Sequence, residues 1–135
     1  MNYDSVFDKW HEECGVFGIY DRTVDVARYV YWGLFALQHR GQESAGIAVT
    51  DGHDVELKKG MGLLTEAIKE LPSLPSYMGT GHVRYSTTGS NNPRNIQPLV
   101  IHYQGGQIAV AHNGNLTNAL SIRKRLETQF AFSSR

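Results

Sequence analysis

Apolar residues recur along this chain with two different periods, which separate predicted strands from predicted helices. The run GVFGIY at 15–20 has the composition of a buried strand. After it, apolar residues recur three and four positions apart, at Val26, Tyr29, Val30, Gly33, Leu34 and Leu37. This spacing is typical of a helix with one buried stripe, and Gly41 is suited to end that helix.

Two pairs of strand-like segments predict antiparallel hairpins. SAGIAVTD and DVELKKG meet at Asp51-Gly52, while LVIHYQ and QIAVAH meet at Gly105-Gly106. Such glycine-containing pairs favour the tight turns that connect adjacent antiparallel strands. We therefore expect antiparallel sheets rather than a parallel arrangement of strands and helices.

Two further helices complete the predicted order of elements. Thr65 can cap a short helix that Pro72 ends. The segment NLTNALSIRKRLETQF places its apolar residues mostly on one helical face, at Leu116, Ala119, Leu120, Leu126 and Phe130. Antiparallel strands with separate helices predict an α+β fold in which helices pack on sheet faces. The chain stops soon after this helix, at AFSSR, and we expect the domain to be truncated there.

Composition limits the protein classes that remain. The 135 residues, 41% of them hydrophobic, are enough for one domain with one core. Thirteen basic and thirteen acidic residues balance, so neither nucleic acid nor an anionic membrane is an expected partner. One cysteine cannot form an internal disulfide, and the opening MNYDSVFDKWHEE is not a signal peptide. We expect a soluble cytoplasmic protein, since no apolar run has the length of a membrane span.

Four short segments carry polar chemistry close to predicted strand ends: ECGVFGI, LQHRGQESAG, GTGHVRYSTTG and AHNGN. Each alone has an ordinary explanation. A lone cysteine is usually a small buried hydrophobe, and Arg40 can be a cation close to a helix C-terminus. The alternation in HVRYST allows His82, Arg84 and Ser86 to face solvent, and NG is a common hairpin turn. His11 and Cys14 have ligand-like spacing, but no second pair completes a metal site, so none is expected.

In this order, the four segments resemble the glutamine amidotransferase domain of the amidophosphoribosyltransferases. QHRGQESAG and HVRYSTTG distinguish this pattern from glucosamine-6-phosphate synthase, whose corresponding segments read YRGYDSAG and HTRWATHG. The resemblance runs from about Glu12 to the last residue. It implies a four-layer αββα sandwich of the N-terminal nucleophile hydrolase type. Residues 1–13 would be a leader, and residues 14–135 a class II glutamine amidotransferase domain that is incomplete at its C-terminus.

The resemblance also implies a role for each candidate site residue. Cys14 would be the nucleophile once the leader is removed, with its own α-amino group as the base. Asn113 and Gly114 would form the oxyanion hole, and Arg84, Thr87 and Arg40 would contact glutamine. An arginine suits the α-carboxylate because its planar fork of donors makes a bidentate contact. Relatives continue beyond AFSSR with a segment of the Ser-Asp-Thr-Glu type, whose Asp pairs with the α-amino group of glutamine.

The implied reaction hydrolyses glutamine and passes the ammonia to a second domain. That domain would form 5-phosphoribosylamine from phosphoribosyl pyrophosphate, the first step of purine nucleotide synthesis, and this chain does not contain it. The resemblance implies no cofactor in this region. Full-length family members use Mg²⁺, and some carry an iron-sulfur cluster, in the absent part. We expect glutamine as substrate and a homo-oligomer for the full-length protein.

Two other functions remain open from the sequence. Cys14 could act inside the chain as the nucleophile of a different cysteine hydrolase, with His112 as its base. Activity with the leader still attached would support this reading. The chain could instead be a noncatalytic binding module in which Cys14 is merely packed. Failure of a thiol reagent to label the folded protein would favour that reading.

Overall fold

The computed structural model describes residues 14–38, 43–85, 92–114 and 116–130. The predicted leader, residues 1–13, lies outside the described residues. In chain order the elements are β1 (Gly15–Tyr20), α1 (Val26–Leu37), β2 (Ser44–Thr50), β3 (Val55–Met61), α2 (Leu64–Ala67), β4 (Met78–Arg84), the 3-10 turn η2 (Pro93–Asn95), β5 (Leu99–Tyr103), β6 (Gly106–Val110) and α3 (Ala119–Glu127).

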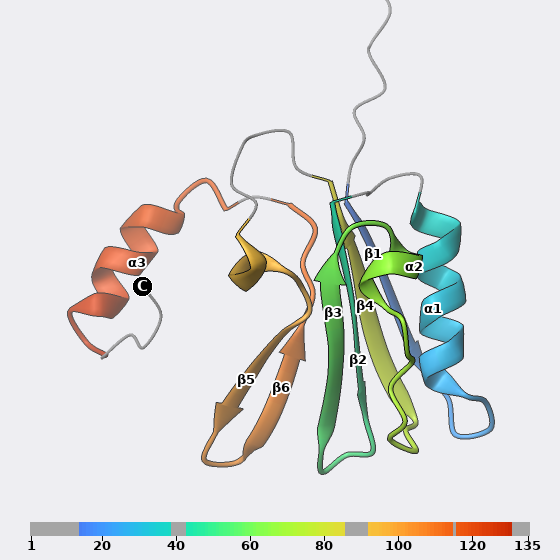
Figure 1. Ribbon diagram of the computed structural model, residues 1–135. Helices are drawn as coiled ribbons and strands as arrows, with labels where there is room; N and C mark the ends of the chain where they lie inside the picture. The colour runs from blue at the N-terminus through green and yellow to red at the C-terminus, as the bar shows by residue number, and fades with distance from the viewer. Residues whose placement is uncertain (1–13, 39–42, 86–91, 115, 131–135) are drawn as a thin grey trace, which may run out of the picture.

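The main sheet has the strand order β1-β4-β2-β3, and all of its neighbouring strands are antiparallel. Strand β4 inserts between β1 and β2 although it follows β3 in the chain (Figure 1). Its residue His82 pairs with Val16 on one side and with Gly46 on the other. Strands β5 and β6 form a separate two-stranded antiparallel sheet.

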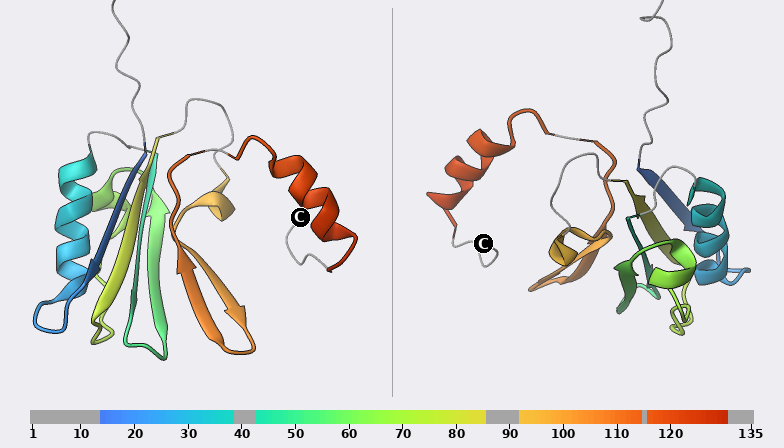
Figure 2. Two further views of the ribbon diagram at one scale, coloured as in Figure 1. Left: turned by 180° about the vertical axis from the view of Figure 1, so that it is seen from behind. Right: turned by 45° about the horizontal axis from the view of Figure 1, so that its top comes forward.

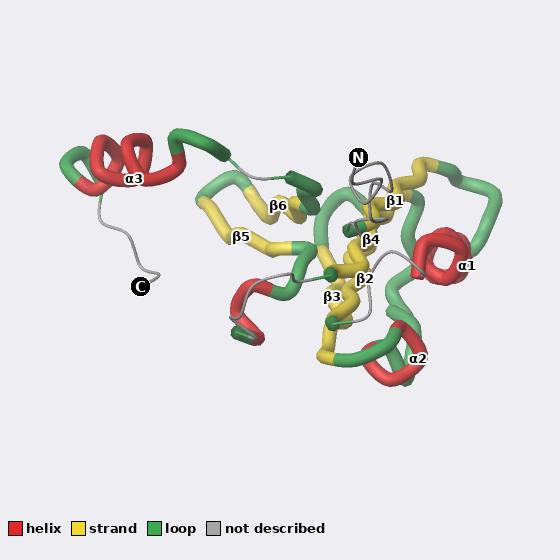
Figure 3. The backbone as a smooth tube through the Cα atoms, turned by 90° about the horizontal axis from the view of Figure 1, so that it is seen from above, coloured by secondary structure: helices red, strands yellow, loops and turns green. Residues whose placement is uncertain are grey.

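The elements are arranged in layers. Helices α1 and α2 cover one face of the main sheet, and the β5–β6 hairpin lies on the opposite side, with α3 beyond it (Figures 2 and 3). The observed fold is α+β with antiparallel sheets, as the sequence predicts. None of the helices in the described ranges has the length and apolar character needed to cross a membrane.

The core lies between α1 and the main sheet, where glycines let the helix approach closely. Val30 and Leu34 of α1 are fully buried. They lie over Gly81 of β4, where an added Cβ would be 2.7 Å from Val30 Cγ1 and 2.6 Å from Leu34 Cδ1. The helix starts at an Asp25 cap, whose carboxylate accepts a hydrogen bond of 3.2 Å from the Arg28 backbone N–H.

Most of the predicted elements are confirmed, with two local corrections. Gly106 pairs with Tyr103 in the second hairpin. The turn of this hairpin therefore lies one residue earlier than the predicted Gly105-Gly106. Thr65 does not cap the short helix. It lies inside α2, which ends at Ala67, well before Pro72. The Glu66 carboxylate accepts a hydrogen bond of 2.9 Å from the Leu63 N–H. The helix therefore begins after Leu63, two residues before the predicted cap at Thr65.

Helix α3 forms where the pattern predicts it, but its apolar face is not buried. Leu116, Leu120 and Phe130 are 63%, 78% and 63% exposed. Within the described residues α3 therefore contributes nothing to the core. The sequence pattern identified the helix and its apolar side. The helix lies beyond the hairpin (Figure 3), and these three apolar residues remain exposed.

Candidate functional site

Cys14 lies at one end of the main sheet, immediately before β1. It is half-buried, and its Sγ donates a weak hydrogen bond of 3.5 Å to the Tyr85 carbonyl. Gly15 pairs with Val83 in the β1–β4 register. Extending that register by one residue places Cys14 opposite Arg84. The sequence placed Cys14 at the beginning of a strand, and the structure confirms that position.

Asn113 reaches Cys14 from a distant part of the chain. It lies in the loop that follows β6, and its Nδ2 donates a hydrogen bond of 2.7 Å to the Cys14 carbonyl across 99 positions of sequence. The next residue, Gly114, has a φ of 137°, a conformation that residues with a Cβ rarely adopt. The structure therefore brings together two of the polar segments that the sequence placed almost at opposite ends.

Arg84 is the last residue of β4 and lies at the same end of the main sheet as Cys14. Its side chain is partly buried, and its Nη1 donates a long hydrogen bond of 3.5 Å to the Asn95 carbonyl. Ser44 is its cross-strand partner in β2. Thr87 and Arg40 are also predicted to contact glutamine, and both lie outside the described residues.

His82 is buried, which corrects the expectation that it could face solvent. It is 1% exposed, and among the described residues neither ring nitrogen has a hydrogen-bond partner. Burial, with a smaller contribution from the charge of Arg84, lowers the pKa of His82 to about 4, so the ring is neutral at pH 7. The alternation of HVRYST correctly puts His82 and Arg84 on one face of β4, but that face is covered.

Gln97 and His112 are joined by a short hydrogen bond that the sequence did not indicate. The His112 backbone N–H donates to Gln97 Oε1 at 2.6 Å. The imidazole of His112 is not a partner of the Cys14 thiol, whose partner within the described residues is the Tyr85 carbonyl. The dipeptide Gln97-Pro98 gives no sequence signal for this contact, because the contact forms only when the hairpin brings His112 back beside Gln97.

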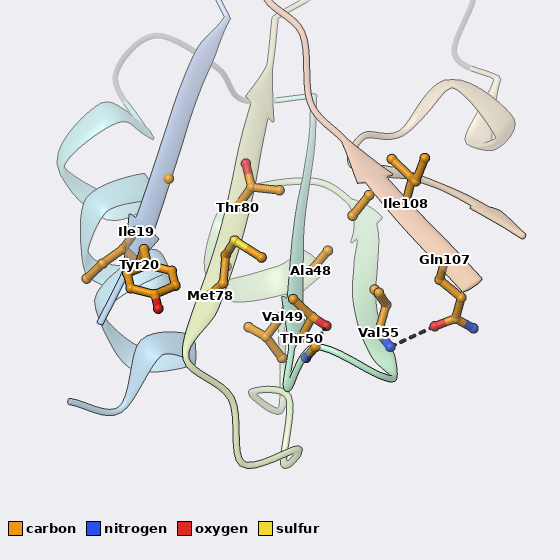
Figure 4. Close-up of a pocket in the computed structure, with 14 residues that line it drawn as sticks. Ile19, Tyr20, Ala48, Val49, Thr50, Val55, Met78, Thr80, Gln107 and Ile108 are labelled. Carbon is orange, nitrogen blue, oxygen red and sulfur yellow. Dashed lines mark hydrogen bonds between the residues drawn. The ribbon is translucent and has the colours of Figure 1, made fainter. Parts of the chain in front are cut away.

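A largely apolar cavity of about 600 Å³ lies between the main sheet and β6 (Figure 4). Its lining includes Tyr20 at the end of β1 and Met78 at the start of β4. These positions are at the other end of the sheet from Cys14. At this end Gln107 accepts a hydrogen bond of 2.7 Å from the Val55 N–H, which ties β6 to β3. The cavity is therefore separate from the polar site.

No cluster of three or more histidine, cysteine, aspartate or glutamate side chains suited to a metal ion occurs in the described part of the chain. The polar groups assembled around Cys14 are an arginine, a side-chain amide and backbone groups. Such a set can bind a carboxylate and stabilise a developing negative charge on oxygen.

Several proteins of known name are similar to this chain over most of its length. An amidophosphoribosyltransferase of Methanocaldococcus jannaschii is 51% identical over 117 residues, which are 84% of this chain and 25% of that protein. One from Staphylococcus aureus strain MRSA252 is 49% identical over 124 residues, covering 90% of this chain and 25% of the relative. The chain therefore spans about a quarter of the length of these relatives.

Solved structures show the same likeness. The glutamine phosphoribosylpyrophosphate amidotransferase of B. subtilis, complexed with ADP and GMP, matches with a TM-score of 0.79 and 43% identity. The match covers 88% of this chain and 26% of that one. A structure described as the allosteric regulatory enzyme of purine biosynthesis matches with the same TM-score and 41% identity. These matches confirm the sandwich class that the sequence resemblance implied.

The family itself follows from the remaining comparison. Residues 41–131 match the sequence profile of the family described as glutamine amidotransferases class-II. This match covers more than half of the chain and includes β2 to α3. The resemblance stated from the four polar segments is thereby confirmed, and the chain belongs to the class II glutamine amidotransferases.

Proposed function

We propose that this chain is the glutamine-hydrolysing part of an amidophosphoribosyltransferase, and that it supplies ammonia for the first step of purine nucleotide synthesis. The observation that carries the proposal is the hydrogen bond of 2.7 Å from Asn113 Nδ2 to the Cys14 carbonyl. It puts a nucleophile and an amide donor at one point, within a chain about half identical to proteins of that name.

Cys14 is the nucleophile in this proposal, and it acts after residues 1–13 are removed. An α-amino group and a thiol have ordinary pKa values of about 8 and 8.5, so the two on one residue can exchange a proton close to neutral pH. While Glu13 is attached, the same nitrogen is an amide and cannot accept that proton. The location of Cys14 just before β1 leaves its nitrogen at the start of the sheet rather than within a strand ladder.

Asn113 and Gly114 hold the oxyanion. One N–H of the Asn113 amide is directed at the Cys14 carbonyl, and a primary amide has a second N–H that remains for substrate. Both residues are exposed on the loop after β6, where a small substrate can reach them. Fixed donors of this kind lower a barrier by about 3 kcal/mol each.

Arg84 binds the α-carboxylate of glutamine. It lies across from Cys14 at the same end of the sheet, and the one hydrogen bond of its side chain among the described residues goes to the Asn95 backbone carbonyl. Within those residues no carboxylate neutralises its charge. A carboxylate ligand would complete a charge-assisted bidentate pair. Thr87 and Arg40 are assigned to the same substrate on the resemblance alone.

Cys14, its α-amino group and the two oxyanion donors are sufficient for each step of glutamine hydrolysis. The Cys14 thiolate attacks the side-chain amide carbon of glutamine, and the oxygen becomes an oxyanion held by Asn113 and Gly114. When the oxyanion collapses, the C–N bond breaks, and the amide nitrogen takes a proton from the Cys14 ammonium and leaves as ammonia. Water then attacks the thioester, which releases glutamate and restores the thiol. The ammonia displaces pyrophosphate from phosphoribosyl pyrophosphate at a second domain.

Other features of the full-length enzyme are assigned outside this chain. An iron-sulfur cluster needs several cysteine ligands, and this chain has one cysteine. The described residues also offer no cluster of carboxylates for Mg²⁺. We assign Mg²⁺, and an iron-sulfur cluster where a full-length family member carries one, to the part of the enzyme beyond this chain. A cytoplasmic location and a homo-oligomeric assembly are part of the same proposal.

Cys14→Ala in the full-length protein tests the assignment. The variant should lose glutamine-dependent formation of 5-phosphoribosylamine by at least about a thousandfold, because the nucleophile is gone. The reaction driven by added ammonia should keep its rate and serves as the internal control, since it does not use Cys14. Undiminished glutamine-dependent activity in the variant would contradict the proposal, and so would equal loss of both reactions.

A further inference from the structure

The loop after β6 carries both proposed oxyanion donors, yet no helix or strand fixes it. Its residues 112–114 are exposed and lie outside regular structure. Within the described residues, two hydrogen bonds anchor this loop to other segments. One is the bond from Asn113 Nδ2 to the Cys14 carbonyl, and the other is the bond of 2.6 Å from the His112 N–H to Gln97 Oε1. The second bond lies one residue before Asn113.

Gln97 holds this loop at the point where the β5–β6 ladder ends. The last residues paired by the ladder are Leu99 and Val110. Extending the register by two residues places Gln97 opposite His112. A continued ladder would use a backbone carbonyl for the His112 N–H, but here the side-chain carbonyl of Gln97 accepts it. The side chain thus replaces a missing ladder bond.

The backbone of Gln97 is itself fixed against the main sheet. Its carbonyl lies directly over Gly46 of β2, where an added Cβ would clash with it. The flanking residues Ile96 and Pro98 are buried, and the Ile96 carbonyl accepts a bond of 3.1 Å from Lys59 Nζ. Because the Gln97 backbone is fixed against the sheet and its side chain makes a short hydrogen bond to the loop, the loop is held at a defined distance from the sheet. Gln97 therefore sets where the His112 peptide lies.

We propose that Gln97 is a positioning residue of the glutaminase reaction. Its Oε1 fixes the His112 peptide and thereby aims the Asn113 amide and the Gly114 N–H at the oxyanion. The inference rests on the proposed function, because it requires those two groups to be the oxyanion donors. A donor displaced by about 1 Å stabilises the transition state less, while a substrate held by other groups still binds.

Gln97→Met in the full-length protein is the direct test, with Gln107→Met as its matched control. Methionine is similar in length to glutamine but offers no comparable acceptor. Gln107 is a glutamine of β6 whose Oε1 accepts from the Val55 N–H at 2.7 Å (Figure 4). Val55 lies at the end of the main sheet opposite Cys14. Gln97→Met should lower the glutaminase kcat about 10- to 100-fold with less than about a threefold change in KM. Gln107→Met should leave kcat within about threefold.

Gln97→Glu supplies the conservative variant, because a carboxylate oxygen still accepts from the His112 N–H. Its kcat should stay within about tenfold of the wild type. If Gln97→Met is insoluble, Gln97→Lys removes the acceptor with a charged side chain of similar length and should show the same loss of kcat.

Three results would overturn the inference: an unchanged kcat in Gln97→Met, a loss confined to KM, or an equal loss of kcat in Gln107→Met, which would indicate a general role in docking the hairpin. The glutaminase activity of the wild-type enzyme shows whether the inference about Gln97 or the proposed function itself has failed. A wild type without glutaminase activity would refute the function itself, whereas an active wild type with an active Gln97→Met variant refutes the inference alone.

Discussion

Arg84 and Asn113 both lie at the Cys14 end of the main sheet, but their side chains offer different polar groups. Arg84 has a planar fork of donors on a half-buried strand end, which suits a carboxylate present in the substrate from the start. Asn113 has an amide that already contacts the Cys14 carbonyl, which suits a charge that develops only during the reaction. Binding and turnover should therefore depend on different residues.

Substitution of each residue in the full-length protein tests this separation. Arg84→Lys should raise the KM for glutamine about 10- to 100-fold, since a point charge replaces a bidentate fork, with little change in kcat. Asn113→Ala should lower kcat about 100- to 1,000-fold with a small change in KM. Steady-state glutaminase kinetics measure both effects. A change in KM alone for both variants would contradict the assignment.

At the scale of elements, the contact between α1 and β4 positions the strand end that carries Arg84. Gly79 and Gly81 of β4 face α1, and an added Cβ at either position would lie within 3.0 Å of Val30 side-chain atoms. Close packing of this kind leaves no space for extra methyl groups. The glycines therefore set how near the helix lies to the sheet, which larger residues at these positions would change.

Gly81→Ala should destabilise this contact by about 1–3 kcal/mol, because the added Cβ overpacks against Val30 and Leu34. Gly18→Ala is the matched control. Its added Cβ would meet the Gly79 carbonyl at 3.9 Å, an ordinary contact, on the opposite face of the sheet. Amide hydrogen exchange of α1 in the full-length protein reports the effect. Exchange should be about 10- to 100-fold faster in Gly81→Ala only, and equal rates in both variants would disprove the overpacking.

At the scale of the whole molecule, the stacking of layers brings Cys14 and Asn113 together across 99 positions of sequence. The strand that follows Cys14 lies in the main sheet, while Asn113 follows the hairpin on the opposite side (Figure 1). The bond between them crosses from one layer to the other. A site built in this way depends on the correct stacking of both sheets and on an unobstructed Cys14.

Removal of the leader is the prediction that belongs to this scale. In active full-length protein the chain should begin at Cys14, because a free α-amino group is needed as the base. Intact-mass measurement checks this directly. A variant lacking residues 2–13, whose initiator Met is removed by the host, should be active without further processing. Full activity with Met1 to Glu13 still attached would refute the prediction and favour a base inside the chain.

The sequence by itself determined the elements and the family. The three-and-four spacing around Val30 and the two hairpin patterns are local, and each records which side of an element is apolar. The structure confirms α1 and both hairpins for that reason. The four polar segments were also sufficient to indicate the class II glutamine amidotransferases, because their order is specific even where each alone is ordinary.

Only the tertiary structure decided which residues meet. The insertion of β4 between β1 and β2 buries His82, although its alternating pattern also fits an exposed strand face. The contacts of Asn113 with Cys14 and of His112 with Gln97 join residues 99 and 15 positions apart. Periodicity describes one element at a time and carries no information on which elements stack. Contacts between layers form only when the sheets pack, so the geometry of the site is fixed at that level.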